Sequence, residues 1–208
     1  LRVLAFSKNK QFLGLVGIAD EVRPEVKDAI NLTRKAGIKV VMVTGDNELT
    51  AKAVGEKIGL LLEGDESLTG SHLNDLNEEE LLQRIGKVRI FARITPQEKL
   101  RIVKAYQSLG EVVAVTGDGV NDALALKQAE VGVSMGKIGT DVSKEASDII
   151  LLDDNFATLV SAVEQGRLIY SNILKVVKFL LTGNLSEMLL IGGGAVLGLP
   201  LPLLPIQI

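Results

Sequence analysis

The sequence predicts an α/β protein with a doubly wound parallel sheet, followed by a long stalk helix that continues into a transmembrane helix. Between about residues 17 and 152, short runs rich in Val and Ile alternate with amphipathic stretches. This alternation is typical of buried parallel strands that are connected by helices. From residue 156 the apolar residues recur at i, i+3 and i+4 instead, which indicates one continuous helix.

The individual elements of the α/β part can be placed from their ends. The candidate strands are 38–43, 88–92, 111–115, 131–134 and 148–152. One helix follows Pro24 and ends at Gly37, and another begins at Thr95-Pro96 and stops at Gly110. Residues 63–80 are too polar for a core, so we expect a surface excursion in which His72 is solvated.

Both ends of the chain look like cuts within a longer polypeptide. The first residues, "LRVLAFS" and "QFLGLVG", predict a hairpin that is completed by chain outside this sequence. We therefore expect three parts: a hairpin from a preceding domain or hinge over 1–16, an α/β domain over 17–155, and a helical part over 156–208. The missing parts of the same polypeptide are the first expected partners.

Composition excludes several classes of function. The 208 residues carry a net charge of −3, without the basic stripe that nucleic-acid binding requires. There is no cysteine, which rules out disulfides and thiolate metal sites. The N-terminal residues also lack the layout of a signal peptide.

Residues 179–199 have the length and composition of a membrane span. Arg167, Lys175 and Lys178 precede this stretch and no cation follows it, which places its start on the cytoplasmic side. We therefore expect residues 1 to about 178 to be cytoplasmic, with membrane lipid as a partner and several spans in the full protein. A buried helix of a large soluble protein is the alternative, but the glycines at 192–194 favour a membrane.

Two predicted strands run into the same three residues, Thr-Gly-Asp. These are Thr44, Gly45 and Asp46 after the first strand, and the start of "TGDGVND" at 116–122 after a later one. In open α/β sheets, ligands bind beyond the carboxyl ends of the strands. Glycine lets the backbone approach a ligand closely, and clustered carboxylates suit Mg²⁺.

Lys99 lies one turn into the helix that begins at Thr95-Pro96, from where its ammonium can reach the same crevice. A hydroxyl, a lysine and an aspartate pair around Mg²⁺ are the apparatus of phosphoryl transfer.

The segments "MVTGDN", "FARITPQEK", "TGDGVNDALAL" and "SDIILLDDNF" occur in this order and resemble the phosphorylation domain of P-type cation-transporting ATPases. That domain belongs to the haloacid dehalogenase superfamily. The resemblance covers essentially the whole chain. It implies ATP as substrate and Mg²⁺ as cofactor. It also implies that residues 1–16 are the end of a nucleotide-binding domain or a hinge hairpin, and that the chain returns from that domain through a hinge at "GIADEVRPEV", which contains Asp20 and Arg23.

The resemblance also implies a role for each site residue. Thr44 and Lys99 would hold the phosphoryl group, and Asp46 and Arg93 would lie towards the nucleotide. Mg²⁺ would be held by Asp118, with the site completed by Asn121 and Asp122.

Three departures from the family pattern affect these roles. Glu21 replaces the usual hinge proline, and Leu124 replaces the proline of "NDAPAL". The nucleophile is missing, because the family phosphorylates an Asp-Lys-Thr-Gly aspartate on an earlier strand and no such motif is present here. The chain alone is therefore expected to be inactive.

Asn184 and Glu187 lie three residues apart within the predicted span and share a helix face. A carboxylate within a membrane is by default a functional-site hypothesis, and both groups are oxygen donors for a cation. An interhelical hydrogen bond from Asn184 is the structural alternative. The "NLSE" segment resembles the Asn-x-x-Glu of calcium and sodium/potassium pumps, and the tail at 198–208 is closer to the calcium version.

The sequence thus predicts part of an ATP-driven cation pump that works through an aspartyl phosphate, with Ca²⁺ as the expected cargo. A Na⁺/K⁺-type pump is the first alternative. A soluble haloacid-dehalogenase-type phosphatase is the second, although that class requires an Asp-x-Asp nucleophile and no membrane span. A truncated module that binds Mg²⁺ or phosphate without turnover is the third.

Overall fold

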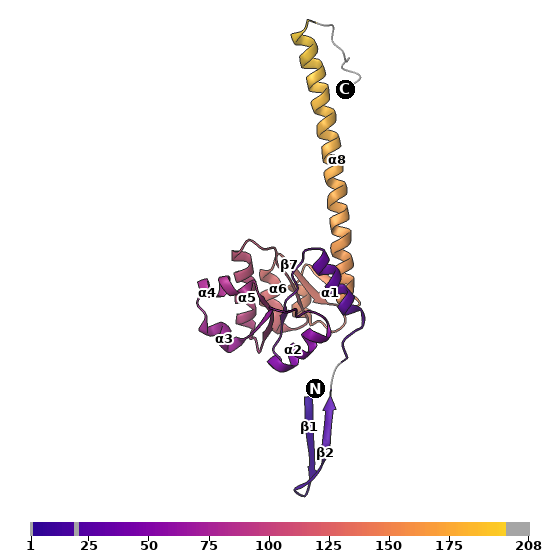
Figure 1. Ribbon diagram of the computed structural model, residues 1–208. Helices are drawn as coiled ribbons and strands as arrows, with labels where there is room; N and C mark the ends of the chain where they lie inside the picture. The colour runs from indigo at the N-terminus through magenta and orange to yellow at the C-terminus, as the bar shows by residue number, and fades with distance from the viewer. Residues whose placement is uncertain (1, 19–20, 199–208) are drawn as a thin grey trace. The chain divides into compact units, whose positions relative to one another are not determined.

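The computed structural model describes residues 2–18 and 21–198 (Figure 1). Its contacts divide the chain into two units, residues 1–160 and 161–208, and each is described by itself. The hinge residue Asp20 and the C-terminal tail from residue 199 lie outside the described residues.

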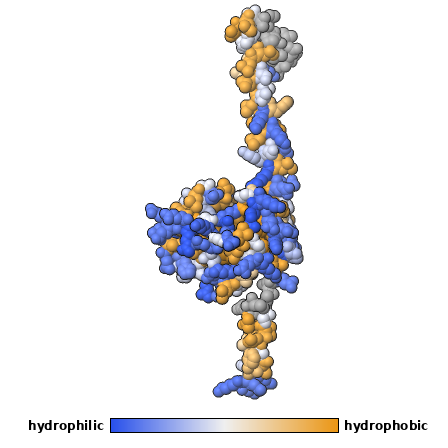
Figure 2. Space-filling view, in the orientation of Figure 1, coloured by the Kyte–Doolittle hydropathy of each residue, from blue (hydrophilic) through white to orange (hydrophobic). Residues whose placement is uncertain are grey.

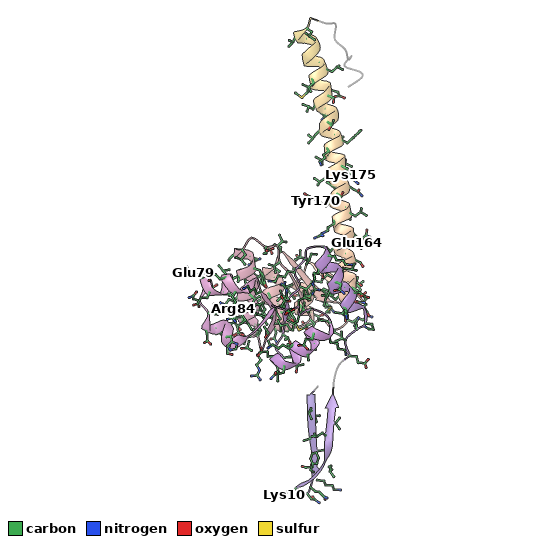
Figure 3. All side chains as sticks on the ribbon, viewed as in Figure 1. Lys10, Glu79, Arg84, Glu164, Tyr170 and Lys175 are labelled. Atoms are coloured by element: carbon green, nitrogen blue, oxygen red, sulfur yellow. The ribbon has the colours of Figure 1, made fainter. Side chains whose placement is uncertain are left out.

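The first elements form an antiparallel hairpin. Strands β1 (Arg2–Lys8) and β2 (Gln11–Ile18) pair along their length, with a register irregularity at Phe6/Ser7. Asn9 and Lys10 form the turn with positive φ angles, and Figure 3 labels Lys10 at its tip. Apolar side chains on both faces of the hairpin are exposed, among them Phe12 and Leu13. Figure 2 shows apolar residues along the face of the hairpin that is in view. The predicted hairpin is thus present, and many of its apolar residues are exposed within the part of the chain that the structure describes.

The α/β part contains two parallel three-stranded sheets where the sequence predicts one. The first has the order β3-β5-β4, with β3 at Met42–Val43, β5 at Val88–Ala92 and β4 at Glu66–Thr69. The second has the order β6-β7-β8, with β6 at Ala114–Gly117, β7 at Val131–Met135 and β8 at Ile149–Leu151. The predicted class, α/β with parallel sheets, is confirmed.

Helices follow the strands, and most have readable caps. Their bounds are α1 Glu25–Lys35, α2 Glu48–Lys57, α3 Gly70–Asp75, α4 Glu78–Ile85, α5 Pro96–Ser108, the 3₁₀ helix η1 Val120–Asp122, α6 Ala123–Gln128 and α7 Asp141–Glu145. Side-chain oxygens of Asn47, Thr69, Asn77, Thr95 and Thr140 cap α2, α3, α4, α5 and α7 in turn.

Strand β5 lies at the centre of the first sheet, and its side chains belong to two separate hydrophobic cores. Phe91 packs into a cluster that includes Leu73 and Ile102, whereas Ile90 and Ala92 pack into another with residues of α1 and α2. Neighbouring side chains of a strand point to opposite faces, so helices cover both faces of β5. This two-sided burial is the doubly wound arrangement that the Val/Ile runs predict.

The predicted surface excursion at 63–80 is wrong. These residues form β4, α3 and the start of α4, and Leu68 and Leu73 are 1% and 0% exposed. Most of the charged residues of the segment are exposed, although Asp65 pairs with Arg89 and is only 12% exposed, and the high density of charge in the sequence obscures two core leucines. His72 belongs to α3 instead of a loop, but it is solvent-exposed as expected and its ring Nδ1 lies 3.1 Å from Thr69 Oγ1.

The last element is α8, a single helix of 41 residues over Phe156–Val196. The amide oxygen of Asn155 accepts from the Ala157 N–H and caps its first turn. At a rise of 1.5 Å per residue the helix is about 60 Å long. Among the described residues it is the one helix long and apolar enough to span a membrane, and only 6% of its most apolar window is buried. This burial is that of the helix within the described residues alone.

Candidate functional site

Lys99 and Asp122 form the closest ion pair of the α/β part. Lys99 is on the first turn of α5 and Asp122 ends η1, and Lys99 Nζ lies 2.5 Å from Asp122 Oδ1. The two side chains are only 19% and 10% exposed. The ammonium and the "TGDGVND" segment thus meet at one place, as the sequence predicts.

The other oxygen of Asp122 organises the turn after β6. Asp122 Oδ2 accepts from the backbone N–H groups of Asp118 and Gly119, at 3.3 Å each. A side chain at Gly117 would collide with Asp122, which explains the glycine at that position. Both carboxylate oxygens of Asp122 are therefore already in use within the protein.

Asp118 is held by its backbone and leaves its carboxylate free. Its carbonyl oxygen accepts from the Thr140 N–H at 2.9 Å and from the Ser143 hydroxyl at 3.1 Å, both at the start of α7. Ser143 is fully buried. Within the described residues no hydrogen bond or ion pair involves the Asp118 carboxylate, and Asn121 beside it is likewise exposed with a free side chain.

A second group of predicted site residues gathers at the end of β3. Thr44 Oγ1 accepts from the Asp46 N–H at 3.1 Å, and the Asp46 carbonyl accepts from the Arg93 N–H at 2.9 Å. Arg93 follows β5 with φ +54°, a left-handed conformation that is uncommon outside glycine. Gly45 is exposed between them. Strained backbone of this kind concentrates at functional sites.

The segment after β5 joins the two groups. The Ile94 N–H donates to the Thr44 carbonyl at 3.0 Å, and α5 with Lys99 begins two residues later. Among the described residues no hydrogen bond or ion pair links Thr44 directly to Lys99 or Asp122. The backbone bond from Ile94 to Thr44 thus links the two groups in the described part of the chain.

Glu98 supports the position of Lys99 and was not among the predicted site residues. Its carboxylate accepts from the Thr95 N–H and hydroxyl and from the Asn74 amide. Burial acts to raise the pKa of Glu98, but these hydrogen bonds together lower it below the ordinary value. The Thr-x-x-Glu spacing of "TPQE" is a capping box and could have revealed this role.

The donor set fits Mg²⁺ in chemistry. Asp118 and Asn121 offer free oxygens at the end of β6, and Mg²⁺ in phosphoryl-transfer sites uses one or two carboxylates together with waters and substrate oxygens. Within residues 2–18 and 21–198 no group of three or more Asp, Glu or His residues is arranged to hold a metal. A protein-only cage is therefore not formed, and Asp122 is engaged by Lys99.

Asn184 and Glu187 lie on α8, in the second unit. The helix places them three residues apart on one face, with Asn184 exposed and Glu187 half-buried. Nearby, the Thr182 and Ser186 hydroxyls donate to the carbonyls of Lys178 and Thr182, so their polar groups are satisfied within the helix.

The family model of haloacid dehalogenase-like hydrolases matches residues 2–130. This is more than half of the chain, and the chain belongs to that family.

Within the family, the chain is similar to calcium-transporting ATPases. It is 54% identical over 201 residues to the calcium-transporting ATPase of Bacillus subtilis (strain 168), covering 97% of this chain and 23% of that protein. It is 46% identical over 213 residues to the human calcium-transporting ATPase type 2C member 2, covering 100% of this chain and 22% of that protein. The chain thus spans less than a quarter of the length of these relatives.

Solved structures agree with this placement. A zinc-transporting PIB-type ATPase in the E2.Pi state matches with a TM-score of 0.69 and 26% identity, over 95% of this chain and 27% of that one. The catalytic domain of a CPx-ATPase matches with a TM-score of 0.55 and 28% identity, over 76% of this chain and 52% of that one.

Proposed function

We propose that this chain is part of an ATP-driven Ca²⁺ pump that works through an aspartyl phosphate whose nucleophile lies outside these 208 residues. The observation that carries the proposal is the 54% identity to a calcium-transporting ATPase over 97% of the chain. This coverage takes in both the Lys99–Asp122 site and α8.

The proposed roles of the site residues follow their contacts. Lys99, held by Asp122, presents positive charge to the transferred phosphoryl group, and the Thr44 hydroxyl binds one of its oxygens. Asp118 and Asn121 would hold Mg²⁺, which neutralises charge that develops on the phosphoryl oxygens when it is bound. The side of the proposed site that faces ATP is formed by Asp46, Gly45 and Arg93.

The unpaired edges of the two sheets support the proposal that the nucleophile lies on a strand outside these 208 residues. Strand β3 has a partner only in β5, and β6 only in β7, so each leaves one edge unpaired among the described residues. Both strands carry the Thr-Gly-Asp sequence at their carboxyl ends. A parallel strand on either edge would bring its own carboxyl end to the same site.

The helical unit supports the transport half of the proposal. Helix α8 is apolar enough to cross a membrane, and Tyr170 and Lys175 (Figure 3) lie on the part that precedes its most apolar residues. We propose that it spans the membrane after about residue 178 and presents Asn184 and Glu187 to the transported cation. Ca²⁺ binds six to eight oxygens and favours carboxylates among them.

The test is phosphoenzyme formation from ATP in the intact pump, titrated separately with Ca²⁺, Na⁺ and K⁺. We expect Ca²⁺ alone to activate, and Glu187→Gln to raise the Ca²⁺ needed by at least about tenfold while ATP binding stays unchanged. Glu164→Gln, on the same helix before the apolar stretch, is the matched control. Activation by Na⁺ without Ca²⁺ would refute the calcium assignment and leave a Na⁺/K⁺-type pump, and a silent Glu187→Gln would refute the cation site.

A further inference from the structure

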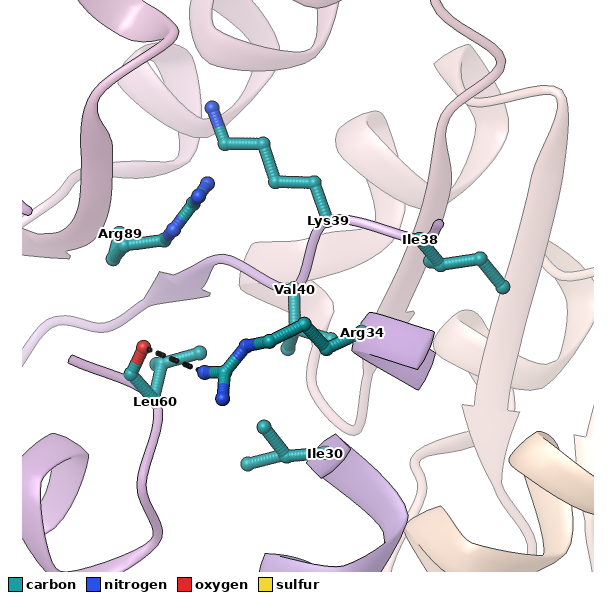
Figure 4. A pocket seen from close by; sticks show the side chains of 7 residues that line it. All are labelled: Ile30, Arg34, Ile38, Lys39, Val40, Leu60 and Arg89. Atoms are coloured by element: carbon teal, nitrogen blue, oxygen red, sulfur yellow. Dashed lines mark hydrogen bonds between the residues drawn. The ribbon is translucent and has the colours of Figure 1, made fainter. Parts of the chain in front are cut away.

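Figure 4 shows a small cavity before β3 that is lined by Arg34, Lys39 and Arg89 among others. Arg34 donates to the Gly59 carbonyl at 2.8 Å, and Lys39 donates to two backbone carbonyls. Arg89 pairs with Asp65 at 3.2 Å. The cations of this cavity are thus used within the chain. A different segment, the loop between β7 and α7, contacts the candidate site.

The loop over residues 136–140 connects β7 to α7 and is bonded at both of its ends. At its start, the Gly136 N–H donates to the Leu151 carbonyl of β8 at 2.8 Å. At its end, the Thr140 N–H donates to the Asp118 carbonyl at 2.9 Å, in the turn after β6. The loop thus lies between the end of β8 and the residue that is proposed to hold Mg²⁺.

Asp154 fixes the middle of this loop. Its Oδ1 accepts from the Lys137 N–H at 2.9 Å, and its Oδ2 accepts from the Ile138 N–H at 3.0 Å. Hydrogen bonds to an ionised acceptor are roughly twice as strong as those between neutral groups. The hydrogen bond from Lys137 is the main reason that the pKa of Asp154 lies below its ordinary value, so the carboxylate is charged at neutral pH.

The backbone of Asp154 is itself held in an uncommon conformation. Its φ of +53° is left-handed, and its N–H donates to the Leu151 carbonyl at 3.1 Å. Left-handed backbone outside glycine costs free energy and persists where the surrounding structure demands it. The adjacent Asp153 bonds locally instead, to the Asn155 N–H and the Thr158 hydroxyl. The two aspartates of "LLDDNF" thus have different tasks, and Asp154 is the one that bonds the loop.

The end of the loop is tightly packed, so a displacement of its middle is passed on. A side chain at Gly139 would collide with the Met135 carbonyl. Beside it, the Thr140 hydroxyl caps α7 by accepting from the Ser143 N–H at 3.2 Å. The Thr140 N–H that bonds the Asp118 carbonyl is therefore placed by the conformation of the whole loop.

We propose that Asp154 is a positioning residue for Asp118 and acts on it through the loop at 136–140. The carbonyl and the carboxylate of Asp118 belong to one residue, so the bond from the loop helps to set the direction in which the carboxylate points. Removal of groups that orient a metal ligand commonly changes metal affinity by about 10- to 100-fold. This role rests on the proposed function, in which Asp118 holds Mg²⁺, and it gives a task to the "SDIILLDDNF" segment.

The test is a Mg²⁺ titration of the purified chain in detergent, followed by the backbone amide NMR signals of Asp118 and Gly119. Asp154→Asn keeps the shape of the side chain and tolerates left-handed backbone, but its amide nitrogen cannot accept from the loop. We expect this variant to weaken Mg²⁺ binding by about tenfold and to speed hydrogen exchange at the Thr140 N–H. Asp153→Asn, the same substitution one residue earlier, is the matched control and should leave both unchanged.

A double-mutant cycle in the intact protein separates positioning from a general loss of stability. The Mg²⁺ concentration needed for phosphoenzyme formation should rise in Asp154→Asn. When Asp154→Asn is added to Asp118→Asn, we expect little further rise, because both changes act on the same ligand. An effect of Asp154→Asn that is equally large in both backgrounds would overturn the proposal. If Asp154→Asn does not fold, Asp154→Gly removes the carboxylate, keeps the positive φ and should give the same result.

The outcomes distinguish the positioning role from the proposed function. Equal Mg²⁺ binding in the parent chain and in the folded Asp154 variants would overturn the positioning role and leave the proposed function intact. An intact protein in which Asp118→Asn leaves the Mg²⁺ requirement unchanged would overturn the Mg²⁺ role of Asp118, and the positioning role with it.

Discussion

Asp122 connects more of the candidate site than any other side chain. One oxygen holds the Lys99 ammonium, and the other holds the N–H groups of Asp118 and Gly119. A carboxylate used in this way acts as a positioning group for its neighbours. The sequence assigns Asp122 to Mg²⁺ together with Asp118, and the geometry favours Asp118 as the free ligand.

In the intact protein, Asp118→Asn is therefore expected to raise the Mg²⁺ concentration needed for phosphoenzyme formation by at least about tenfold, because it removes the charged ligand. The measurement is labelled phosphoenzyme as a function of Mg²⁺. Asp75→Asn, an exposed carboxylate at the end of α3, serves as the control and should have no effect. An unchanged Mg²⁺ requirement in Asp118→Asn would show that another group binds the metal.

Helix α5 makes contacts with both halves of the α/β part, the first sheet and the second. Its first turn carries Lys99, which pairs with Asp122 in the turn after β6 of the second sheet, while Ile102 packs in the core of the first sheet. At its other end, Gln107 donates to the Gln128 carbonyl and to Glu130. The start of α5 is fixed by the capping box between Thr95 and Glu98.

Thr95→Ala is expected to lower the free energy of unfolding by about 1 kcal/mol, because it removes the cap of α5. Chemical denaturation of the chain, followed by circular dichroism, measures this. Ser108→Ala is the matched control at the other end of the helix, where the hydroxyl is exposed and bonds only the Lys104 carbonyl. Equal losses in both variants would contradict the special role of the cap.

The capping box between Thr95 and Glu98 also predicts that the free energy of unfolding depends on pH. Hydrogen bonds hold the pKa of Glu98 below its ordinary value of 4.5, so the unfolded chain binds its proton more readily than the folded chain. The stabilisation from Glu98 is present above about pH 4.5 and is lost as the pH falls through the lower, folded-state pKa. In Glu98→Gln the fall in stability below this pH should be shallower than in the parent chain, and an identical slope would count against the assignment.

The sequence predicts some strands and contacts correctly and misses others, and the reasons are physical. The strands at 88–92 and 131–134 are clear because both of their faces are buried, and their bounds agree with β5 and β7. Strand β4 is missed because only Leu68 of "ESLT" enters the core. Lys99 and Asp122 are predicted to share a crevice, but a pattern of residues cannot show that they form an ion pair.

At the scale of the whole chain, the residues proposed to bind the phosphoryl group, Thr44 and Lys99, come without the Asp-Lys-Thr-Gly motif of the family nucleophile. Asp46 and Asp118 follow strands without the Asp-Lys-Thr-Gly neighbours of the family nucleophile. The purified chain is therefore expected to form no acid-stable phosphoenzyme from labelled ATP, whereas under the proposed function the intact protein is expected to form it in the presence of Ca²⁺. Label retained on the chain after acid precipitation would overturn this expectation.

The edges of β3 and β6 that are unpaired among residues 2–18 and 21–198 also have a consequence for biosynthesis. The residues around β6 are strongly apolar, and Val112 just before it is 80% exposed. An apolar strand with a free row of N–H and C=O groups is a template for other chains. While a ribosome makes this segment, the nascent chain therefore exposes an aggregation-prone strand edge until a matching strand pairs with it. Chaperone binding would be concentrated at these two strands, and a segment released without a matching strand would tend to enter inclusion bodies.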